Sequence, residues 1–370
     1  MKFESYESTS ADTSFTSSAE QVLRIPESKN DDSQLKNIGQ YNQELQSILP
    51  KETFKRDPLR GSWIIINFAV MYLLGMLVMK EAMPIYAKIL LGIAFGIVSA
   101  RNTFLAHEIL HGAIFKNKTL EKVTGFLGFT NCMISPTYWC FWHNKLHHGN
   151  TQLLYKDPDA FPTRSVWKKS KFMQRVFKLS PGSGYFRSIF YFFYWFSFQA
   201  FINQAWMRFG NKMWAKLDHK KVTFEFSLQI AIVGTYLYLI GPSNWIYLAI
   251  IPFAVQNYTL TSYIFTNHNL CPYTKVNDAL VNSLTVTNHP ILEFLHMNFG
   301  YHTEHHIFPN MPMSSAKKVN KALKLLYPDK FQEMPKGRAL KLLYTTPRVY
   351  KDRTTLIHPE TGREVNLPVR

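Results

Sequence analysis

The stretch His302-Thr303-Glu304-His305-His306 places three imidazoles within five residues, and two of them are adjacent. Both nitrogens of an imidazole need partners, so burying two such rings side by side without partners costs free energy. Imidazole is also the commonest metal ligand among protein side chains. The stretch therefore indicates a metal site rather than ordinary core packing, and it directs attention to the other histidines.

Two similar clusters lie upstream, and we name the three clusters box one, box two and box three in chain order. Box one reads HEILH from His107 to His111, and box two reads HNKLHH from His143 to His148. Eight of the 13 histidines fall in the boxes. Eight or nine neutral imidazoles can hold two metal ions, and imidazole suits iron, zinc and copper alike. Ligand type alone therefore does not identify the metal.

Box one by itself also fits the zinc-protease pattern H-E-x-x-H. His107 and His111 are four residues apart, so on a helix they share one face and can clamp a metal. In a membrane zinc metalloprotease Glu108 would be the general base. One zinc ion leaves most box histidines unused, so this alternative explains less of the sequence.

Four apolar segments predict an all-α integral membrane protein with four transmembrane helices. The segments cover residues 61–79, 84–105, 224–240 and 245–265. Each is about long enough to cross a bilayer core of roughly 30 Å. Short connections at 80–84 and 241–244 join them as two hairpins, and basic residues precede the first. The positive-inside rule then predicts a multi-pass protein whose three boxes share a cytoplasmic, histidine-rich cap.

Two further apolar segments are interrupted. Residues 125–142 are broken by Pro136, so we expect a buried or re-entrant segment. Residues 185–206 are aromatic but contain several polar side chains, which favours a helix lying at the membrane interface. If 185–206 spanned the membrane alone, box three would lie across the bilayer from box two.

The ends of the chain differ in composition from the middle. Residues 1–50 are polar and predict a disordered N-terminal arm, with room for a short helix near 35–48. We expect the membrane domain to cover 51–330 and a basic tail to cover 331–370. The net charge of +17 suits a nucleic-acid binder, but no such motif occurs. Contacts with membrane lipid explain the charge, so no nucleic-acid partner is expected.

Motifs around the boxes resemble the membrane fatty acid desaturase family, which includes alkane, carotenoid and sphingolipid desaturases and hydroxylases. They are TNHNLCP at 266–272 and the run that begins NFGYH at 298–302 and ends at Phe308-Pro309. The resemblance covers roughly residues 60–330. It implies an oxidoreductase of lipid metabolism that inserts a double bond into the acyl chain of an acyl lipid or acyl thioester.

The resemblance also implies a di-iron centre (Fe2+/Fe3+) with O2 as co-substrate. Cytochrome b5 haem motifs are absent, so the electron donor is expected to be a separate ferredoxin or cytochrome b5 type protein. The family adds a ninth ligand between boxes two and three, for which His268 is preferred over His296 and His289. The expected iron ligands are His107, His111, His143, His147, His148, His268, His302, His305 and His306.

Two points stay open at the level of sequence. Glu108 and Glu304 lie inside boxes and could orient ligand imidazoles, but surface carboxylates are an equal alternative. Box two has the spacing HxxxHH, which is shared with alkane hydroxylases, so a di-iron lipid, alkane or carotenoid hydroxylase is the alternative function. The sequence does not distinguish a bacterial inner membrane from the endoplasmic reticulum.

Overall fold

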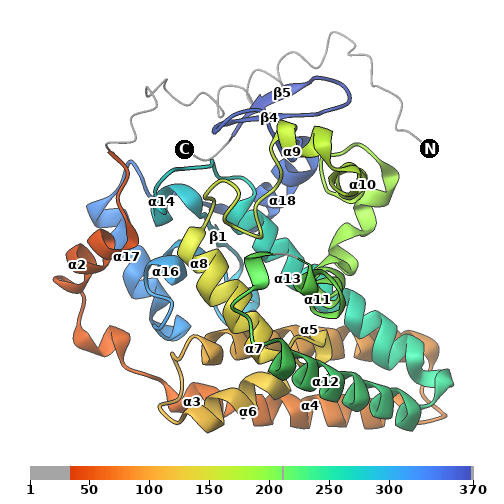
Figure 1. Cartoon of the computed structure of the whole chain (residues 1–370). Coiled ribbons are helices and arrows are strands. Elements are labelled where there is room, and N and C mark those ends of the chain that lie inside the picture. Colours follow the sequence, from red (N-terminus) through yellow and green to blue (C-terminus); the bar gives the residue numbers. More distant parts are fainter. Residues whose placement is uncertain (1–33, 211, 368–370) are drawn as a thin grey trace.

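The computed structural model describes residues 34–210 and 212–367, and it is mostly helical (Figure 1). Three helical stretches in these residues are long and apolar enough to cross a membrane: Lys51–Val78, which includes α4 (Trp63–Val78), α5 (Ile85–Leu110) and α12 (His219–Ile240). In Figure 1 they run along the lower edge of the molecule. Buried Met71, Phe95 and Ile240 join all three in one hydrophobic cluster.

The fourth predicted segment, 245–265, is helical, but its composition differs from that of the other three. It forms the π-helical turn η9 (Ile246–Ile250) and then α13 (Ile251–His268). Gln256, Asn257 and Thr261 are buried within α13, which makes this helix less apolar than a typical span. The prediction of four spans in two hairpins therefore stays a prediction, whereas three candidate spans are present.

Close packing of α5 against η9 and α13 depends on two glycines of α5. A Cβ on Gly92 would lie 2.5 Å from the carbonyl oxygen of Tyr247, and one on Gly96 would lie 2.7 Å from Cβ of Val255. Only a residue without a Cβ permits this approach. The two helices therefore run in contact up to the ends that carry box one and His268.

Two of the candidate spans extend beyond their predicted limits. Helix α5 continues five residues past 105 to Leu110, and α12 begins at His219 rather than 224. Asp218 caps α12 by accepting a hydrogen bond from the backbone N–H of Lys221 at 3.0 Å. Hydropathy misses these turns because their polar residues lie outside the apolar run, although the backbone remains helical.

The segment 125–142 reverses direction in the structure. Helix α6 (Lys118–Phe129) is followed by the turn η3 (Thr130–Cys132), and Met133 adopts a left-handed φ of 54°. Helix α7 (Pro136–Trp139) then begins at Pro136, where the fixed φ of proline suits a first helical position. The chain continues through the π-helix η4 (Cys140–His147) and α8 (His148–Asn150), which carry box two.

The segment 185–206 consists of two helices rather than one. A 3-10 helix, η5 (Phe186–Phe193), precedes α11 (Trp195–Ala205). Phe186, Phe190 and Phe198 are exposed, while Tyr191 and Trp195 are buried. This two-faced pattern is typical of a segment at a membrane interface. The short helices α9 (Arg164–Lys169) and α10 (Lys171–Leu179) precede it.

The remaining elements gather above the candidate spans in Figure 1 and include short strands that the all-α prediction lacks. They are α14 (Ala279–Asn282), β1 (Thr285–Thr287), α15 (Pro290–Leu295), α16 (His302–Ile307), α17 (Ala316–Leu326), β2 (Glu333–Pro335), α18 (Lys336–Thr345), β3 (Val349–Tyr350), β4 (Thr355–Ile357) and β5 (Glu364–Asn366). Strands β1 and β2 pair in parallel, and β3, β4 and β5 form an antiparallel sheet.

Both predicted terminal extensions contain ordered elements. Residues 1–33 of the expected arm lie outside the described residues, but 34–50 include α2 (Ile38–Gln46). Buried Tyr41 of α2 donates a hydrogen bond to Asp278 at 2.9 Å. In the expected tail, the Arg348 guanidinium is buried and donates to the carbonyl oxygen of Asn269. Both extensions therefore contact the segment between His268 and box three.

Candidate metal centre

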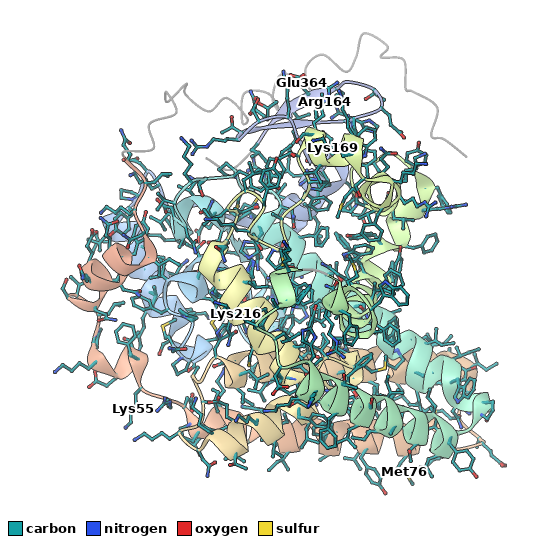
Figure 2. The ribbon with its side chains drawn as sticks, viewed as in Figure 1. Lys55, Met76, Arg164, Lys169, Lys216 and Glu364 are labelled. Atoms are coloured by element: carbon teal, nitrogen blue, oxygen red, sulfur yellow. The ribbon has the colours of Figure 1, made fainter. Side chains whose placement is uncertain are left out.

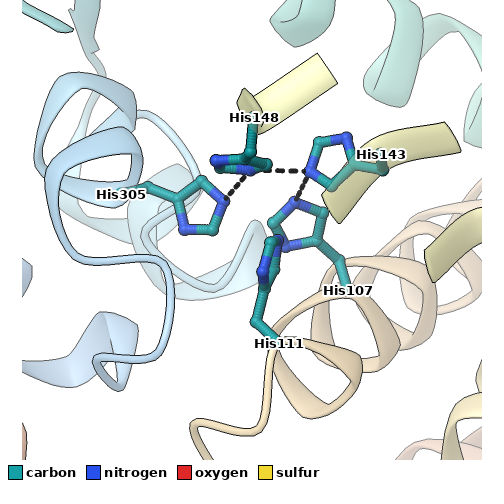
Figure 3. Close-up of side chains that lie close together, drawn as sticks. All are labelled: His107, His111, His143, His148 and His305. Atoms are coloured by element: carbon teal, nitrogen blue, oxygen red, sulfur yellow. Dashed lines mark hydrogen bonds between the residues drawn. The ribbon is translucent and has the colours of Figure 1, made fainter. Parts of the chain in front are cut away.

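The structure brings the nine expected ligands together in two adjacent groups. The five-histidine group contains His107, His111, His143, His148 and His305, and the four-histidine group contains His147, His268, His302 and His306. Within each group the nearest ring nitrogens lie within 4.8 Å of one another. Figure 3 shows the rings of the first group pointing toward a common centre from three separate parts of the ribbon.

Helix ends supply most of these side chains. His107 lies in the last turn of α5 and His111 caps that helix, while His268 is the last residue of α13. Box three forms α16, where His302 and His306 are one turn apart. Box two occupies the wider turns of η4, which place His143 in one group and His147 in the other.

The hydrogen-bond partners of the four-histidine group show which ring nitrogens are free to bind a cation. His147 faces the Asp157 carboxylate through Nδ1 at 3.0 Å, and His268 faces the carbonyl oxygen of Asn282 through Nδ1 at 3.1 Å. Both partners only accept, so Nδ1 carries a proton in each ring. Nε2 then presents a lone pair in the neutral form of either ring, which is the form that binds a metal. These two Nε2 atoms nevertheless lie 3.2 Å apart.

His306 completes the same pattern. Its Nδ1 lies 3.2 Å from the Thr151 hydroxyl oxygen, and that hydroxyl already donates to the carbonyl oxygen of His147. Nδ1 of His306 is therefore the donor, and its Nε2 is a third lone pair, 3.1 Å from Nε2 of His268. When all three rings are neutral, their converging lone pairs repel one another, whereas a metal ion would accept all of them. The group fits a cation.

The five-histidine group has the same close contacts. Nε2 of His143 lies 2.9 Å from that of His107 and 3.1 Å from that of His148, which is 3.1 Å from Nε2 of His305. Burial lowers the pKa of His148 well below its ordinary value and lowers that of His305 to about 3. These rings are therefore neutral, which is the form of imidazole that binds metals.

Asp157 is a site residue that the sequence prediction missed. Burial alone would lower the pKa of His147, but the charge and hydrogen bond of Asp157, together with the charge of Asp159, outweigh burial and raise the pKa. Besides His147, the carboxylate accepts the backbone N–H groups of Gln152 at 2.8 Å and Asp159 at 3.0 Å. A carboxylate in this position fixes the tautomer and orientation of a ligand. Its only sequence signal is its place ten residues after His147.

Glu108 and Glu304, for which ligand orientation and a surface position were equal alternatives, are both buried and have other partners in the structure. Glu108 forms an ion pair with Arg60, whose Nε lies 2.8 Å from one carboxylate oxygen, and it accepts the backbone N–H of Met313 at 2.9 Å. Glu304 accepts hydrogen bonds from Thr285 at 2.6 Å and Asn320 at 2.7 Å. Neither is hydrogen-bonded to a box histidine among the described residues. They join segments of the backbone around the site instead.

This arrangement also bears on the zinc-protease alternative. A general base must reach the water bound to its metal. Both oxygens of Glu108 are engaged by Arg60, and the carboxylate points away from the five-histidine group toward the loop that carries Met313. The pattern H-E-x-x-H is therefore present in sequence without the geometry that a zinc protease needs.

The other two candidates for the ninth ligand lie outside both groups. His296 shares a 2.8 Å hydrogen bond with the hydroxyl of Tyr263 through Nδ1. His289 is exposed and caps α15, where its ring accepts from the backbone N–H of Ile291. Only His268 of the three candidates lies among the box histidines.

A narrow, mostly apolar pocket leads to both groups, with a free volume of about 60 Å3. At one end it is lined by His107, His143, His147, His268 and His302. Elsewhere its walls include Thr103 of α5, Trp142 of η4, Trp195 of α11, Leu260 of α13 and Phe299 from the loop before α16. Its mostly apolar lining suits hydrocarbon groups rather than a polar ligand.

Comparison with known proteins agrees with this site. The family model described as fatty acid desaturase matches residues 84–336. An omega-6 fatty acid desaturase of spinach chloroplasts is 22% identical over 346 residues, which cover 87% of this chain and 73% of the relative. A sphingolipid delta(4)-desaturase of Candida albicans is 26% identical over 68% of this chain and 66% of the relative.

A third relative is the sn-1 acyl-lipid omega-3 desaturase (ferredoxin) of Synechocystis. It is 24% identical over 60% of this chain and 62% of its own length. The family model spans boxes one, two and three together with His268, and so it includes all nine histidines of the two groups. This chain belongs to the fatty acid desaturase family.

Proposed function

We propose that the protein is a membrane-embedded fatty acid desaturase that uses two iron ions, one held by each histidine group. The observation that carries the proposal is the convergence of ring nitrogens at two adjacent points that lie on a narrow apolar pocket. When bound, the irons would supply O2 activation and the oxidising power for removing two hydrogens from an acyl chain. His268 completes the set of nine ligands in this proposal.

The protein itself supplies position and environment. The pocket walls would position one pair of methylenes of an acyl chain beside both histidine groups. Apolar and aromatic side chains such as Leu260 and Phe299 would exclude water from this part of the chain. Asp157 would hold the ring of His147 in one tautomer, and Asn282 would do so for His268.

The remaining parts of the proposal concern location and partners. The substrate is an acyl lipid or acyl thioester, and electrons come from a separate ferredoxin or cytochrome b5 type protein. The protein crosses the membrane as two hairpins, with α13 as the fourth span and the histidine groups on the cytoplasmic side. In support, box one and His268 lie at the ends of α5 and α13, and the histidines of box three in α16 meet them there.

The test is expression in a host that provides a suitable reductase, followed by metal counting and lipid profiling by mass spectrometry. We expect about two irons per chain and a lipid product two mass units lighter than its precursor, as a double bond requires. His147→Ala and His305→Ala should abolish product and lower iron content. His289→Ala is the matched control and should retain both.

Product analysis also separates the alternatives. An alcohol as the main product would indicate the hydroxylase reaction on the same scaffold. One zinc per chain without iron would contradict the proposal, and so would full activity of His147→Ala or His305→Ala.

A further inference from the structure

A second cavity lies beside the candidate spans, away from the apolar pocket that reaches the two histidine groups, which we call the acyl pocket. It is an open cleft with a free volume of about 690 Å3. It lies between the segment before α4, the loop after α5 and the loop after α16, which contribute Arg56, Gly112 and Asn310 respectively. The cleft shares no lining residue with the acyl pocket, so a ligand here would be distinct from the reacting chain.

The charge of the cleft has one sign. Three cationic residues, Lys55, Arg56 and Lys116, contribute to its lining, and no acidic residue does. All three are exposed, and among the described residues neither Lys55 nor Lys116 has an ion-pair partner. The nearby carboxylate of Glu121 is already paired with Lys118 at 2.9 Å. The cleft therefore offers uncompensated positive charge to an anion.

The position of the cleft indicates which anion. Lys55, Arg56 and Pro58 lie in the first part of the candidate span Lys51–Val78, before α4 begins at Trp63, and Gly112 follows the end of α5 at Leu110. In Figure 2, Lys55 and Met76 mark opposite ends of α4. Two spans that end at the cleft place it at the depth of lipid headgroups.

Exposed apolar side chains point to the same environment: Leu120 lines the cleft, Leu59 follows the lining residue Pro58, and Val123 lies three residues after Leu120. Leu59 is 83% exposed, Leu120 is 43% exposed and Val123 is 51% exposed. Exposed apolar residues beside exposed cations match a lipid molecule. Its acyl chains would cover the apolar residues, and its headgroup would contact the cations. A soluble acidic protein would neutralise the cations but would leave these leucine and valine side chains without an apolar partner.

We propose that this cleft binds the phosphate-bearing headgroup of an anionic membrane phospholipid that is not the substrate. The proposal rests on the membrane location in the proposed function, but it does not depend on the reaction. Arg56 also donates a hydrogen bond through Nε to the carbonyl oxygen of Gly112 at 2.9 Å, next to His111. We therefore leave Arg56 unchanged in the test and alter only the two unpaired lysines.

The experiment uses the full chain in detergent and counts bound lipid by native mass spectrometry. The probes are dioleoyl-phosphatidylglycerol, dioleoyl-phosphatidylcholine and inorganic phosphate. We expect the wild-type protein to prefer phosphatidylglycerol, and Lys55→Gln/Lys116→Gln to bind it roughly thirtyfold more weakly. Lys168→Gln/Lys169→Gln removes the same charge from α9, at the top of Figure 2, and should bind normally. Iron content should not change in either variant.

Each other outcome would overturn the proposal. Equal weakening in both double variants would show an effect of net charge rather than a site. Unchanged phosphatidylglycerol binding in the cleft variant would exclude the cleft, and displacement of the lipid by low concentrations of inorganic phosphate would indicate an anion site without lipid preference. Loss of affinity for an acidic redox donor with normal lipid binding would assign the cleft to that donor. Since no readout requires turnover, failure here is distinguishable from failure of the proposed function.

Discussion

Asp157→Asn offers a sharp test of how the four-histidine group is organised. One carboxylate oxygen accepts from Nδ1 of His147 and the backbone N–H of Asp159, both at 3.0 Å, and the other accepts from the backbone N–H of Gln152 at 2.8 Å. Asparagine has nearly the same shape but replaces one oxygen with a donor. Whichever way the amide is turned, at least one buried N–H group loses its acceptor.

The expected magnitude follows from that loss. A buried donor without a partner costs about 1–3 kcal/mol. If the amide turns its NH2 group toward His147, the ring loses the acceptor that holds its tautomer, and loss of such a partner weakens metal binding by about 10- to 100-fold. That range corresponds to about 1.4–2.8 kcal/mol, so the two estimates agree.

The assay is iron retained per chain, measured by mass spectrometry against increasing chelator. Asp157→Asn should release iron at a roughly 10- to 100-fold lower chelator concentration than the wild type. Glu225→Gln is a matched control, because Glu225 also accepts several hydrogen bonds, from Ser135 and Thr137, but contacts no histidine of either group. Equal iron loss in both variants, or wild-type retention in Asp157→Asn, would refute the role of Asp157 as a ligand-orienting residue.

Three other changes should have distinct effects. His268→Ala should lose product and part of the iron, whereas His296→Ala should keep its iron, because only His268 lies in a histidine group; iron counting on both variants decides between them. Glu108→Gln should lower the free energy of unfolding by roughly 3 kcal/mol, because it leaves the partly buried Arg60 without its counter-charge. Iron per folded chain should stay normal, and a selective loss of iron would contradict this structural role. Burial lowers the pKa of Lys336 from 10.5 to about 7, so between these pH values the unfolded chain binds this proton more readily and stability should rise with pH. Lys336→Met should flatten this rise in melting temperature, and an unchanged pH profile in the variant would contradict the role of Lys336.

The place of His268 beside the box histidines could be predicted from sequence because it depends on local position. His268 follows the last apolar segment directly, and the structure places it at the end of α13, level with the box histidines. His289 and His296 lie in the loop before box three, where sequence does not say which way a ring points. The helical register of α13 makes the first case predictable, whereas the contact of His296 with Tyr263 depends on packing between distant segments.

The sequence by itself determined the ligand type, the grouping into boxes and the candidate spans, because these depend on residue identity and short spacing. Only the tertiary structure decided how box two divides between the two groups, since the π-helical turns of η4 separate His143 from His147. It also decided that Asp157 contacts His147 while Glu108 pairs with Arg60. A carboxylate's partner is set by which segments meet in space, and contacts across 48 residues, as between Arg60 and Glu108, leave no local pattern in the chain.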